Sequence, residues 1–361
     1  MIKENVFDGY AFPGTKDIEH MRRSAKVSSV DVAVSDNIQC ITSQSGFLSN
    51  VNNKVAFIAL LSEYLHLANI TVVQCPGDAD RTIVCTALEN STSAMPAVIV
   101  GEDTDLLVLI IGLADRNTNI HMLMPANKDR PARVYSSKQL QSSLGSMSAY
   151  ILFYHAMTGC DTTSAPFRKG KRLNFAKFSK NNDLRKRVDV FNNSESSPDD
   201  VASAGEAFLM SMYESSSGAT LDEMRYTSYK RHVAKQPTYA KFDLAILPPT
   251  SCAAREHSLR VFHQVQAWRG IQLPPTEWGW KLAEEHLIPI TSLKAPAPQK
   301  LIKLIACNCK SGCERSCQCM QAGFKCNTMC GYCTGHGCSN RVIEDDVEDD
   351  DTVLETQADA V

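Results

Sequence analysis

Residues 97–110 read AVIVGEDTDLLVLI, and this stretch decides the fold. A short apolar strand at Ala97–Val100 leads into a turn with two aspartates and then into a long apolar segment, which is the pattern of a buried strand followed by a helix. The same alternation extends to both sides. The sequence predicts strands at residues 2–7, 70–74 and 120–124, and helices at residues 54–67, 78–90, 138–144 and 147–158. Strands that alternate with helices favour an α/β fold with a parallel sheet flanked by helices.

Length and composition divide the chain into several parts. Its 361 residues are 43% hydrophobic, which is enough to bury a core and excludes a wholly disordered protein. The longest apolar run, Leu106–Ala114, is too short to span a membrane, and no apolar signal region opens the sequence, so we expect neither membrane insertion nor secretion. The segments that we predict are an α/β domain (1–175), a helical extension (176–293) with an exposed loop near 192–200, a linker (294–299), a cysteine-rich domain (300–341) and a disordered acidic tail (342–361).

Five aspartates stand where predicted strands or helices end. They are Asp78, Asp80, Asp103, Asp105 and Asp161. The carboxyl ends of parallel strands meet at one edge of a sheet, so we expect these side chains to converge there. Clustered carboxylates repel one another unless cations neutralise them, and oxygen ligands suit Mg²⁺ or Mn²⁺, a pair of which can promote phosphodiester hydrolysis. The same aspartates could instead cap the helices that follow them, so both interpretations stay open.

Nine of the fourteen cysteines lie in one short stretch with the spacing C-x-C-x3-C-x3-C-x-C-x6-C-x3-C-x2-C-x4-C. They are Cys307, Cys309, Cys313, Cys317, Cys319, Cys326, Cys330, Cys333 and Cys338. Such a density of thiols indicates a metal site more than a set of disulfides, and His336 is an alternative ligand. Six cysteines that each bind one ion and three that each bridge two would hold about three tetrahedral zinc ions. So short a segment builds no hydrophobic core, so we expect zinc to stabilise it.

The acidic segments resemble the flap endonuclease family of PIN-like nucleases. The run VFDGYAFPGTKDIEHMRRS at residues 6–24 is similar to the family's strand with a metal-binding aspartate, which adds Asp8 to the site. GDADRTI, GEDTDLL and TGCDTT resemble the family's other acidic elements in the same order, although the family has glutamates where this chain has Asp78 and Asp80. The resemblance implies a PIN-like fold and a catalytic set of Asp8, Asp78, Asp80, Asp103, Asp105 and Asp161.

The same resemblance implies a nucleic-acid contact and a departure from the family. The family's last acidic element precedes a helix-hairpin-helix that grips the DNA backbone, and a basic run fills that place here: Arg168, Lys169, Lys171 and Arg172. The family's sheet begins with an earlier strand and aspartate, whereas this sequence starts at the counterpart of the second acidic strand. We therefore expect weaker Mg²⁺ or Mn²⁺ binding than in a complete family member, poor cleavage or none, and an open apolar flank on the strand that carries Asp8.

The cysteine stretch CNCKSGCERSCQCMQAGFKCNTMCGYCTGHGCSN resembles the tesmin-type CXC domain, including the closing C-x-N with Asn340. Members of that family bind DNA, and paired copies insert a tyrosine that precedes the second C-x-C into the minor groove. Ser316 stands at that position here, and the sequence holds one copy. We therefore expect phosphate contacts with weak sequence preference, made by Lys310, Arg315 and Lys325.

These features predict an intracellular nucleic-acid-binding protein, with DNA as the favoured ligand. Metal-dependent phosphodiester hydrolysis is one alternative, and a catalytically inactive nuclear DNA-binding or scaffold protein is the other. The basic runs Arg168–Arg172 and Arg185–Arg187 match a bipartite nuclear import signal, although a solvated basic face explains them about as well. The acidic tail either solubilises the chain or competes with nucleic acid for a basic surface. The sequence points to no particular protein partner.

Overall fold

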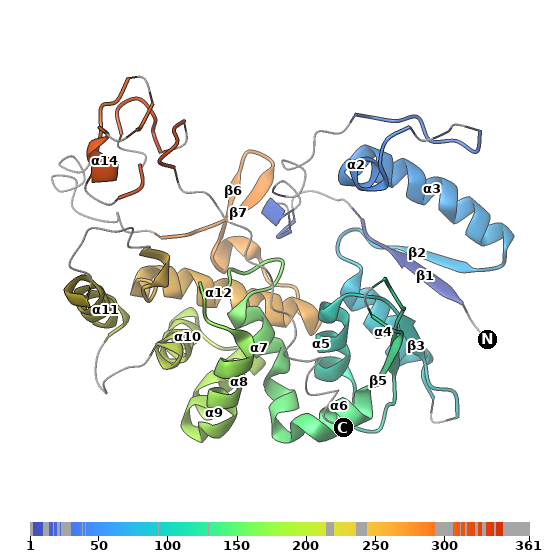
Figure 1. Cartoon of the computed structure of the whole chain (residues 1–361). Helices are drawn as coiled ribbons and strands as arrows, with labels where there is room; N and C mark the ends of the chain where they lie inside the picture. The colour runs from blue at the N-terminus through green and yellow to red at the C-terminus, as the bar shows by residue number, and fades with distance from the viewer. Residues whose placement is uncertain are drawn as a thin grey trace.

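The structure is a computed structural model of the 361-residue chain (Figure 1). It describes residues 3–9, 14–16, 18–19, 22, 30–37, 39, 41–92, 94–128, 130–213, 220–235, 244–292, 306–310, 312–314, 316–321, 324–326, 330–335 and 337–341. The predicted linker at 294–299, the acidic tail at 342–361 and the candidate residues Arg315 and His336 lie outside the described residues. The fold is mixed α/β, with many helices, small sheets and a cysteine cluster.

The first sheet has two strands. β1 (Glu4–Phe7) pairs in parallel with β2 (Thr71–Gln74). The short helix α2 (Gln44–Ser49) and the long helix α3 (Val51–Leu67) make the crossover between them. These elements confirm the predicted strands at 2–7 and 70–74 and the helix at 54–67. Figure 1 shows α3 lying along the two strands, so this part of the chain forms a thin layer of one sheet and one helix.

The second sheet has three strands. β3 (Val98–Val100) pairs in parallel with β4 (His121–Met124), and β4 pairs antiparallel with β5 (Arg133–Ser136). Helix α4 (Asp80–Asn90) leads from β2 to β3, and helix α5 (Thr104–Leu113) joins β3 to β4. The apolar run at 106–114 is thus almost all helix, and its residues from Leu106 to Ile111 are buried.

The expectation of one parallel sheet needs two corrections. β5 was not predicted and runs antiparallel, because the short connection after β4 cannot carry the crossover that a parallel strand requires. The two parallel pairs also remain separate sheets, since each crossover joins only its own pair and no strand among the described residues bridges β1 and β3. On β3 the side chains of Val98 and Val100 are 57% and 64% exposed, whereas Val6 and Phe7 of β1 are half-buried, so the apolar exposure lies on β3 rather than on the strand beside Asp8.

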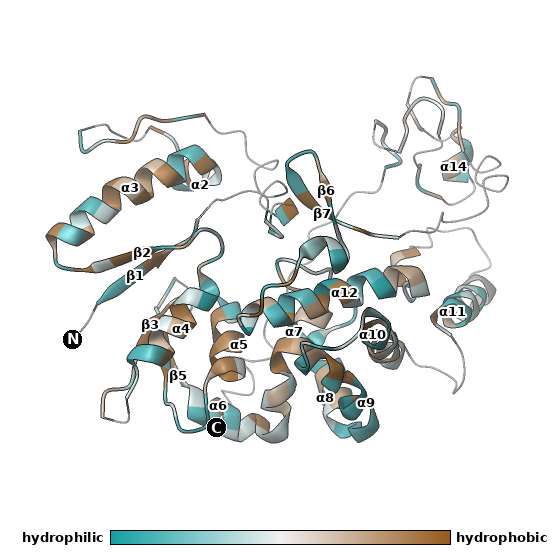
Figure 2. Cartoon of the chain, turned by 180° about the vertical axis from the view of Figure 1, so that it is seen from behind, coloured by the Kyte–Doolittle hydropathy of each residue, from teal (hydrophilic) through white to brown (hydrophobic). Residues whose placement is uncertain are grey.

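Helices build the rest of the body around one hydrophobic core. The core contains residues from Val84 to Trp278, so the predicted α/β domain and helical extension share it. Figure 2 shows its apolar residues on α5 and α7, and Phe153 of α7 has its ring centroid 4.5 Å from Phe191 and 5.1 Å from Phe208. The elements are α6 (Ser137–Leu144), η1 (Gly145–Tyr150), α7 (Ile151–Thr158), α8 (Lys171–Lys180), α9 (Asn182–Val188), η2 (Asp189–Asn192), α10 (Pro198–Met212), α11 (Leu221–Lys235), η3 (Leu244–Ile246), α12 (Ser251–Trp268) and η4 (Pro275–Glu277). Within the described ranges, none of the helices has the length and apolar character needed to cross a membrane.

Helix α12 ties several parts of the body together. Arg260 Nη1 donates to the carbonyls of Gly279 and Ile290, which holds the antiparallel hairpin of β6 (Trp280–Ala283) and β7 (His286–Pro289) against the helix. At the other end, Arg81 Nε of α4 donates to the Trp268 carbonyl oxygen over 3.0 Å. The start of α4, where Asp80 stands, is therefore fixed to α12.

Candidate metal centres

The nine cysteines near the end of the chain form a compact cluster. Seven are buried, while Cys309 and Cys338 are half-buried. Neighbouring sulfur atoms lie at spacings that match two thiolates on one ion. The Sγ–Sγ distances are 3.6 Å for Cys307–Cys313 and Cys319–Cys330, and 3.9 Å for Cys307–Cys326 and Cys317–Cys326. Two thiolates on one tetrahedral zinc lie about 3.8 Å apart, whereas a disulfide is about 2.05 Å long.

The cluster offers overlapping sets of ligands. Three sets of four cysteines have all their sulfur atoms within 4.8 Å of one another. Cys307 belongs to all three sets, and Cys313, Cys317 and Cys326 each belong to two. Overlap of this kind lets one sulfur bridge two ions. The described cysteines form no disulfide. The cysteine cluster could therefore hold zinc or another metal.

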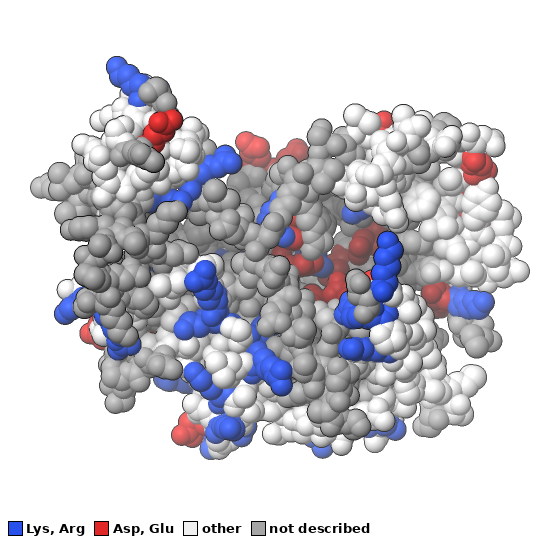
Figure 3. All heavy atoms as spheres, viewed as in Figure 1, with Lys and Arg blue, Asp and Glu red and all other residues white. Residues whose placement is uncertain are grey.

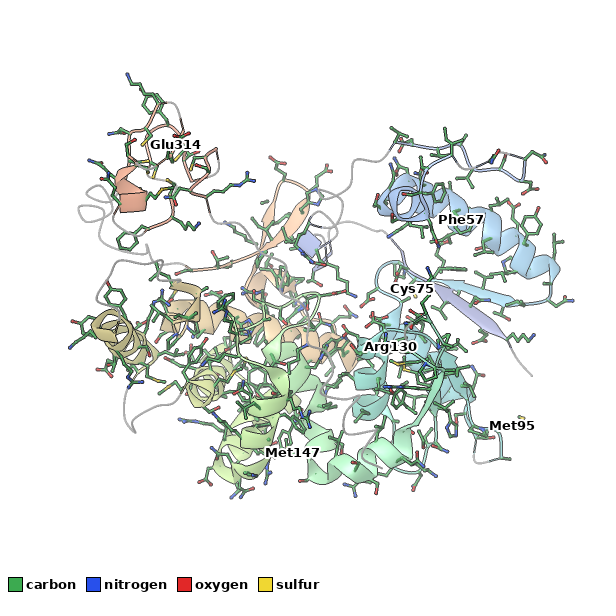
Figure 4. All side chains as sticks on the ribbon, in the orientation of Figure 1. Phe57, Cys75, Met95, Arg130, Met147 and Glu314 are labelled. Atoms are coloured by element: carbon green, nitrogen blue, oxygen red, sulfur yellow. The ribbon has the colours of Figure 1, made fainter. Side chains whose placement is uncertain are left out.

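The cysteine module is the region whose described residues lie between 306 and 341, and its backbone closes around these sulfurs. Besides α14 (Gln318–Gln321), its described residues form turns and loops. Asn340 is buried and joins distant parts of the module, because its carbonyl oxygen accepts from Cys326 N over 2.9 Å and its amide donates to Phe324 O over 2.9 Å. The Gly331 N–H donates to Cys307 O over 2.9 Å. Apart from Asn340, every buried residue described in this module is a cysteine, so sulfur takes the place of a hydrophobic core (Figure 4, near Glu314).

The thiols of this cluster have displaced pKa values. Burial raises the pKa of Cys307 to about 11 and that of Cys319 to about 12. Burial would also raise the pKa of Cys317, but a hydrogen bond from the Met320 backbone and bonds within the cluster lower it to about 7. Since metal ligands are thiolates, metal binding has to release the protons that the buried thiols hold.

The predicted aspartates converge at a second site. Lys16 Nζ lies 3.0 Å from Asp78 Oδ1, 3.6 Å from Asp80 Oδ2 and 3.2 Å from Asp161 Oδ2. Asp78 and Asp80 stand at the start of α4, whereas Asp161 follows α7, so the fold brings together carboxylates that are far apart in the sequence. Figure 3 shows acidic side chains deep in a hollow of this face. The structure also places a cation, Lys16, between these carboxylates.

The remaining aspartates take part in helix starts at the same site. Asp103 caps α5, because its Oδ1 accepts from Asp105 N over 2.9 Å. Asp8, at the end of β1, accepts from Ala79 N over 2.9 Å and so binds the start of α4. Asp105 Oδ1 contacts the ring nitrogen Nε2 of His155 at 2.9 Å. The capping interpretation is therefore correct for Asp103, yet capping leaves it among the other carboxylates.

The charges of the acidic site act on one another. Burial and the charge of Asp78, with smaller contributions from Asp103 and Asp105, raise the pKa of Asp80 to about 8, although Lys16 opposes this shift. Burial, together with Asp105, raises the pKa of Asp103. Burial would raise the pKa of Asp105 too, but the contact with His155 and the charges of Lys16 and Lys171 together outweigh it, so the pKa is lowered. Burial would lower the pKa of Lys16, but the three carboxylates hold it above its ordinary value. A site with this excess of negative charge favours cations.

Two residues of the acidic site were not assigned from the sequence. Lys16 lies within residues 6–24, the segment that resembles the nuclease family. That resemblance, rather than any residue spacing, was the sequence feature that could have pointed to it. His155 lies in an apolar helix, and the structure pairs it with Asp105. Its signal was weak, because nothing in the local pattern of α7 relates residue 155 to residue 105.

The basic run beside the acidic site is partly anchored. Arg168 and Arg172 are exposed, whereas Lys169 and Lys171 are half-buried. Lys169 Nζ lies 4.1 Å from the centroid of the Tyr213 ring, and the Tyr154 hydroxyl donates to the Lys171 carbonyl oxygen. The positive charge of Lys171 reaches Asp105, where it contributes to the lowered pKa. The predicted phosphate-binding run therefore borders the acidic site.

The cysteine module carries its own exposed basic residues. Lys310 and Lys325 are both exposed, and Ser316 is exposed at the position where the resemblance places a tyrosine. Lys310 Nζ lies 5.9 Å from the ring centroid of Tyr332, which is 59% exposed. Two of the three predicted phosphate contacts are thus available on the surface, and the third, Arg315, is outside the described residues.

Comparisons with known proteins give no family for the chain. No protein-family model, no curated protein and no solved structure matches it. The roles of the residues in both metal centres are assigned from their chemistry and their positions in the structure.

Proposed function

We propose that the chain is a nucleic-acid-binding protein in which a PIN-like α/β domain presents a nuclease-like acidic metal site and a CXC module binds zinc. The observation that carries the proposal is the convergence of carboxylates on one point from separate elements, with three of them within 3.6 Å of the Lys16 ammonium. Two parallel crossovers, β1–α3–β2 and β3–α5–β4, support the PIN-like assignment. DNA is the ligand that the CXC resemblance favours.

The acidic site has the donors that Mg²⁺ or Mn²⁺ prefers. The predicted set of Asp8, Asp78, Asp80, Asp103, Asp105 and Asp161 would supply the ligands. Bound there, such a cation activates water and stabilises the charge that develops on a phosphodiester during hydrolysis. The chain itself fixes two of these carboxylates in advance: Asp103 through its helix cap and Asp105 through His155. Lys16 supplies a positive charge at the same point, which would attract a phosphate group once cations neutralise the carboxylates.

Two groups of basic residues would bind the nucleic-acid backbone: the run Arg168–Arg172, and Lys310 with Lys325 in the cysteine module. Arg168 and Arg172 are exposed, and the charge of Lys171 between them in the sequence acts on Asp105, so a strand held by this run would pass close to the carboxylates. Lys310 and Lys325 would contact phosphates from the cysteine module. Because Ser316 replaces the tyrosine that reads the minor groove, we infer weak sequence preference. The basic runs Arg168–Arg172 and Arg185–Arg187 would also serve as a nuclear import signal.

The cysteine module would bind about three zinc ions through its nine thiolates. Its overlapping sets of four sulfurs support bridging by shared cysteines, and Cys307 is the most shared. Because the buried residues described there are cysteines and Asn340, the zinc would act as the core of the module.

A second candidate function has its own supporting observation. Lys16 already contacts three carboxylates of the acidic site and offsets part of their negative charge, so the fold can hold this cluster without a divalent cation. A catalytically inactive DNA-binding or scaffold protein would keep the site in that form.

One experiment separates these candidates. The full chain and its Asp103→Asn plus Asp105→Asn variant are incubated with labelled single-stranded DNA, duplex DNA and RNA, with and without Mn²⁺. Cleavage that needs Mn²⁺ and disappears in the variant supports the nuclease, and binding without cleavage supports the inactive protein. Absence of both binding and cleavage would contradict the proposal. The matched control is Asp115→Asn, which changes an exposed aspartate just after α5.

A further inference from the structure

His155 is a buried polar side chain directed at the acidic site. It lies on α7, whose residues are all buried, and its side chain is 8% exposed. Its Nε2 atom is 2.9 Å from Asp105 Oδ1. The geometry of this contact falls short of a well-aligned hydrogen bond, and in the described part of the chain Nε2 has no other polar partner. A buried imidazole nitrogen needs a polar partner, and Asp105 is the carboxylate that lies within reach of Nε2.

The surroundings of His155 hold its ring in place. The ring centroid of Trp268 lies 5.9 Å away, with an angle of 37° between the two ring planes. The carbonyl oxygen of Trp268 accepts from Arg81, the residue that follows Asp80. Trp268 of α12 thus contacts both His155, through its ring, and the start of α4 beside Asp80, through its carbonyl oxygen.

Asp105 has two independent restraints. Its backbone N–H is fixed by the cap that Asp103 provides, which leaves the side-chain torsions as its main freedom. The contact with His155 fixes Oδ1 and leaves Oδ2 as the oxygen that a cation can take. Carboxylates that bind metals are themselves held by a second layer of hydrogen bonds, whose loss weakens metal affinity.

We propose that His155 is a positioning residue: its Nε2–H donates to Asp105 Oδ1 and orients the other oxygen toward a divalent cation. This inference rests on the proposed function, because it needs a cation at the acidic site. It goes beyond that function in assigning a role to a residue that touches neither the cation nor the nucleic acid.

A pair of substitutions distinguishes positioning from packing. In His155→Gln the amide nitrogen can reach the place of Nε2, whereas in His155→Asn the amide nitrogen overlays Nδ1 and stops short of Asp105. Both substitutions remove the ring, so a loss of packing affects both. We expect His155→Gln to keep an Mn²⁺ affinity within about 3-fold of the full chain, and His155→Asn to lose about 10- to 100-fold. The Mn²⁺ affinity of each protein is measured by titration with Mn²⁺, with free and bound Mn²⁺ distinguished by electron paramagnetic resonance.

The outcomes are separable from those of the proposed function. If the unaltered chain binds no Mn²⁺, the proposed function fails. If it binds Mn²⁺ and the two variants weaken binding equally, or not at all, the role of His155 is overturned while the acidic site stands.

A measurement on the unaltered chain guards against variants that fail to fold. Nitrogen-15 NMR of the histidines reports which ring nitrogen carries the proton. We expect a proton on Nε2 of His155, with a resonance that shifts when Mg²⁺ is added. A proton on Nδ1 alone would leave Nε2 unable to donate to Asp105 and would overturn the inference.

Discussion

The cysteine module and the acidic site are two candidate metal centres built in opposite ways. All nine cysteines of the module come from residues 307–338, and their sulfurs are the core of that module. The aspartates come from residues 8–161 and are brought together by helices and strands that have a core of their own. Metal at the first centre would therefore create the structure, whereas metal at the second would be added to a structure that already exists. This difference decides how each centre responds to substitution.

The largest expected effect is in the cysteine module. Replacement of Cys307 by Ser should release zinc and unfold residues 306–341, because Cys307 belongs to every set of four sulfurs and structural zinc contributes about 10–16 kcal/mol to folding in small zinc domains. Cys309→Ser should unfold the module less completely, since Cys309 belongs to one set and is half-buried. Elemental analysis with hydrogen exchange of the whole chain measures both effects.

The control for this substitution is Cys85→Ser, which lies on α4 outside the cluster. It should leave the zinc content unchanged. Equal zinc content in the Cys307→Ser variant and the unaltered chain would contradict the cluster, and loss of protection in α5 or α7 as well would contradict the separation of the two regions.

A smaller effect is expected from Asp80. Because its pKa is raised to about 8 in the folded chain, the folded state holds a proton that the unfolded state has lost, and stability falls as pH rises from about 4 to 8. Asp80→Asn removes this loss and leaves Lys16 paired with Asp78 and Asp161. Without added Mg²⁺ or Mn²⁺, we expect the variant to be more stable at pH 8 by on the order of 1–3 kcal/mol and unchanged near pH 4.

Urea denaturation at both pH values measures the free energy of unfolding for this comparison. Asp115→Asn is the control and should show no such pH dependence, because Asp115 is exposed. A variant that is less stable than the unaltered chain at pH 8 would mean that Asp80 is held by attraction to Lys16 more than it is repelled by its neighbours.

The smallest expected effect concerns nucleic-acid binding by the two regions. Arg172→Gln and Lys325→Gln each remove one exposed basic side chain. If that side chain contacts a phosphate, each substitution should lower the slope of log affinity against log salt concentration by about 1. Fluorescence anisotropy with a labelled duplex over a salt series measures the slope, and Lys281→Gln on β6 is the control. A change for one residue only would assign binding to one region, and no change for either would exclude both basic groups.

The sequence was most informative where structure is local. Cysteine spacing alone predicted the cysteine cluster, which could hold a metal, because all nine cysteines belong to one segment. The strand and helix pattern placed Asp103 and Asp105 correctly at the start of a helix, because that turn depends on adjacent residues. The last residues of helices α3 and α7, at 67 and 158, were also predicted correctly for this reason.

The sequence was less informative where distant residues meet. Lys16 contacts Asp161 and His155 contacts Asp105, and neither pair has a spacing that a pattern could reveal. The sequence also did not predict that β1–β2 and β3–β4–β5 form separate sheets, because strand pairing between distant segments depends on tertiary contacts. The antiparallel β5 was missed because residues 133–136 are polar at Arg133 and Ser136 and lack a clear alternation.

The central claim is that the aspartates at the ends of β1, β2 and β3, with Asp161, form a site for a divalent cation. Isothermal titration of the zinc-loaded chain with Mn²⁺ tests it most directly, with the Asp103→Asn plus Asp105→Asn variant and Asp115→Asn beside it. We expect saturable Mn²⁺ binding to the unaltered chain and to Asp115→Asn, at least about 10-fold weaker binding to the double variant, and equal zinc content in all three. Mn²⁺ binding that is absent from the unaltered chain, or the same in the double variant, would contradict the claim.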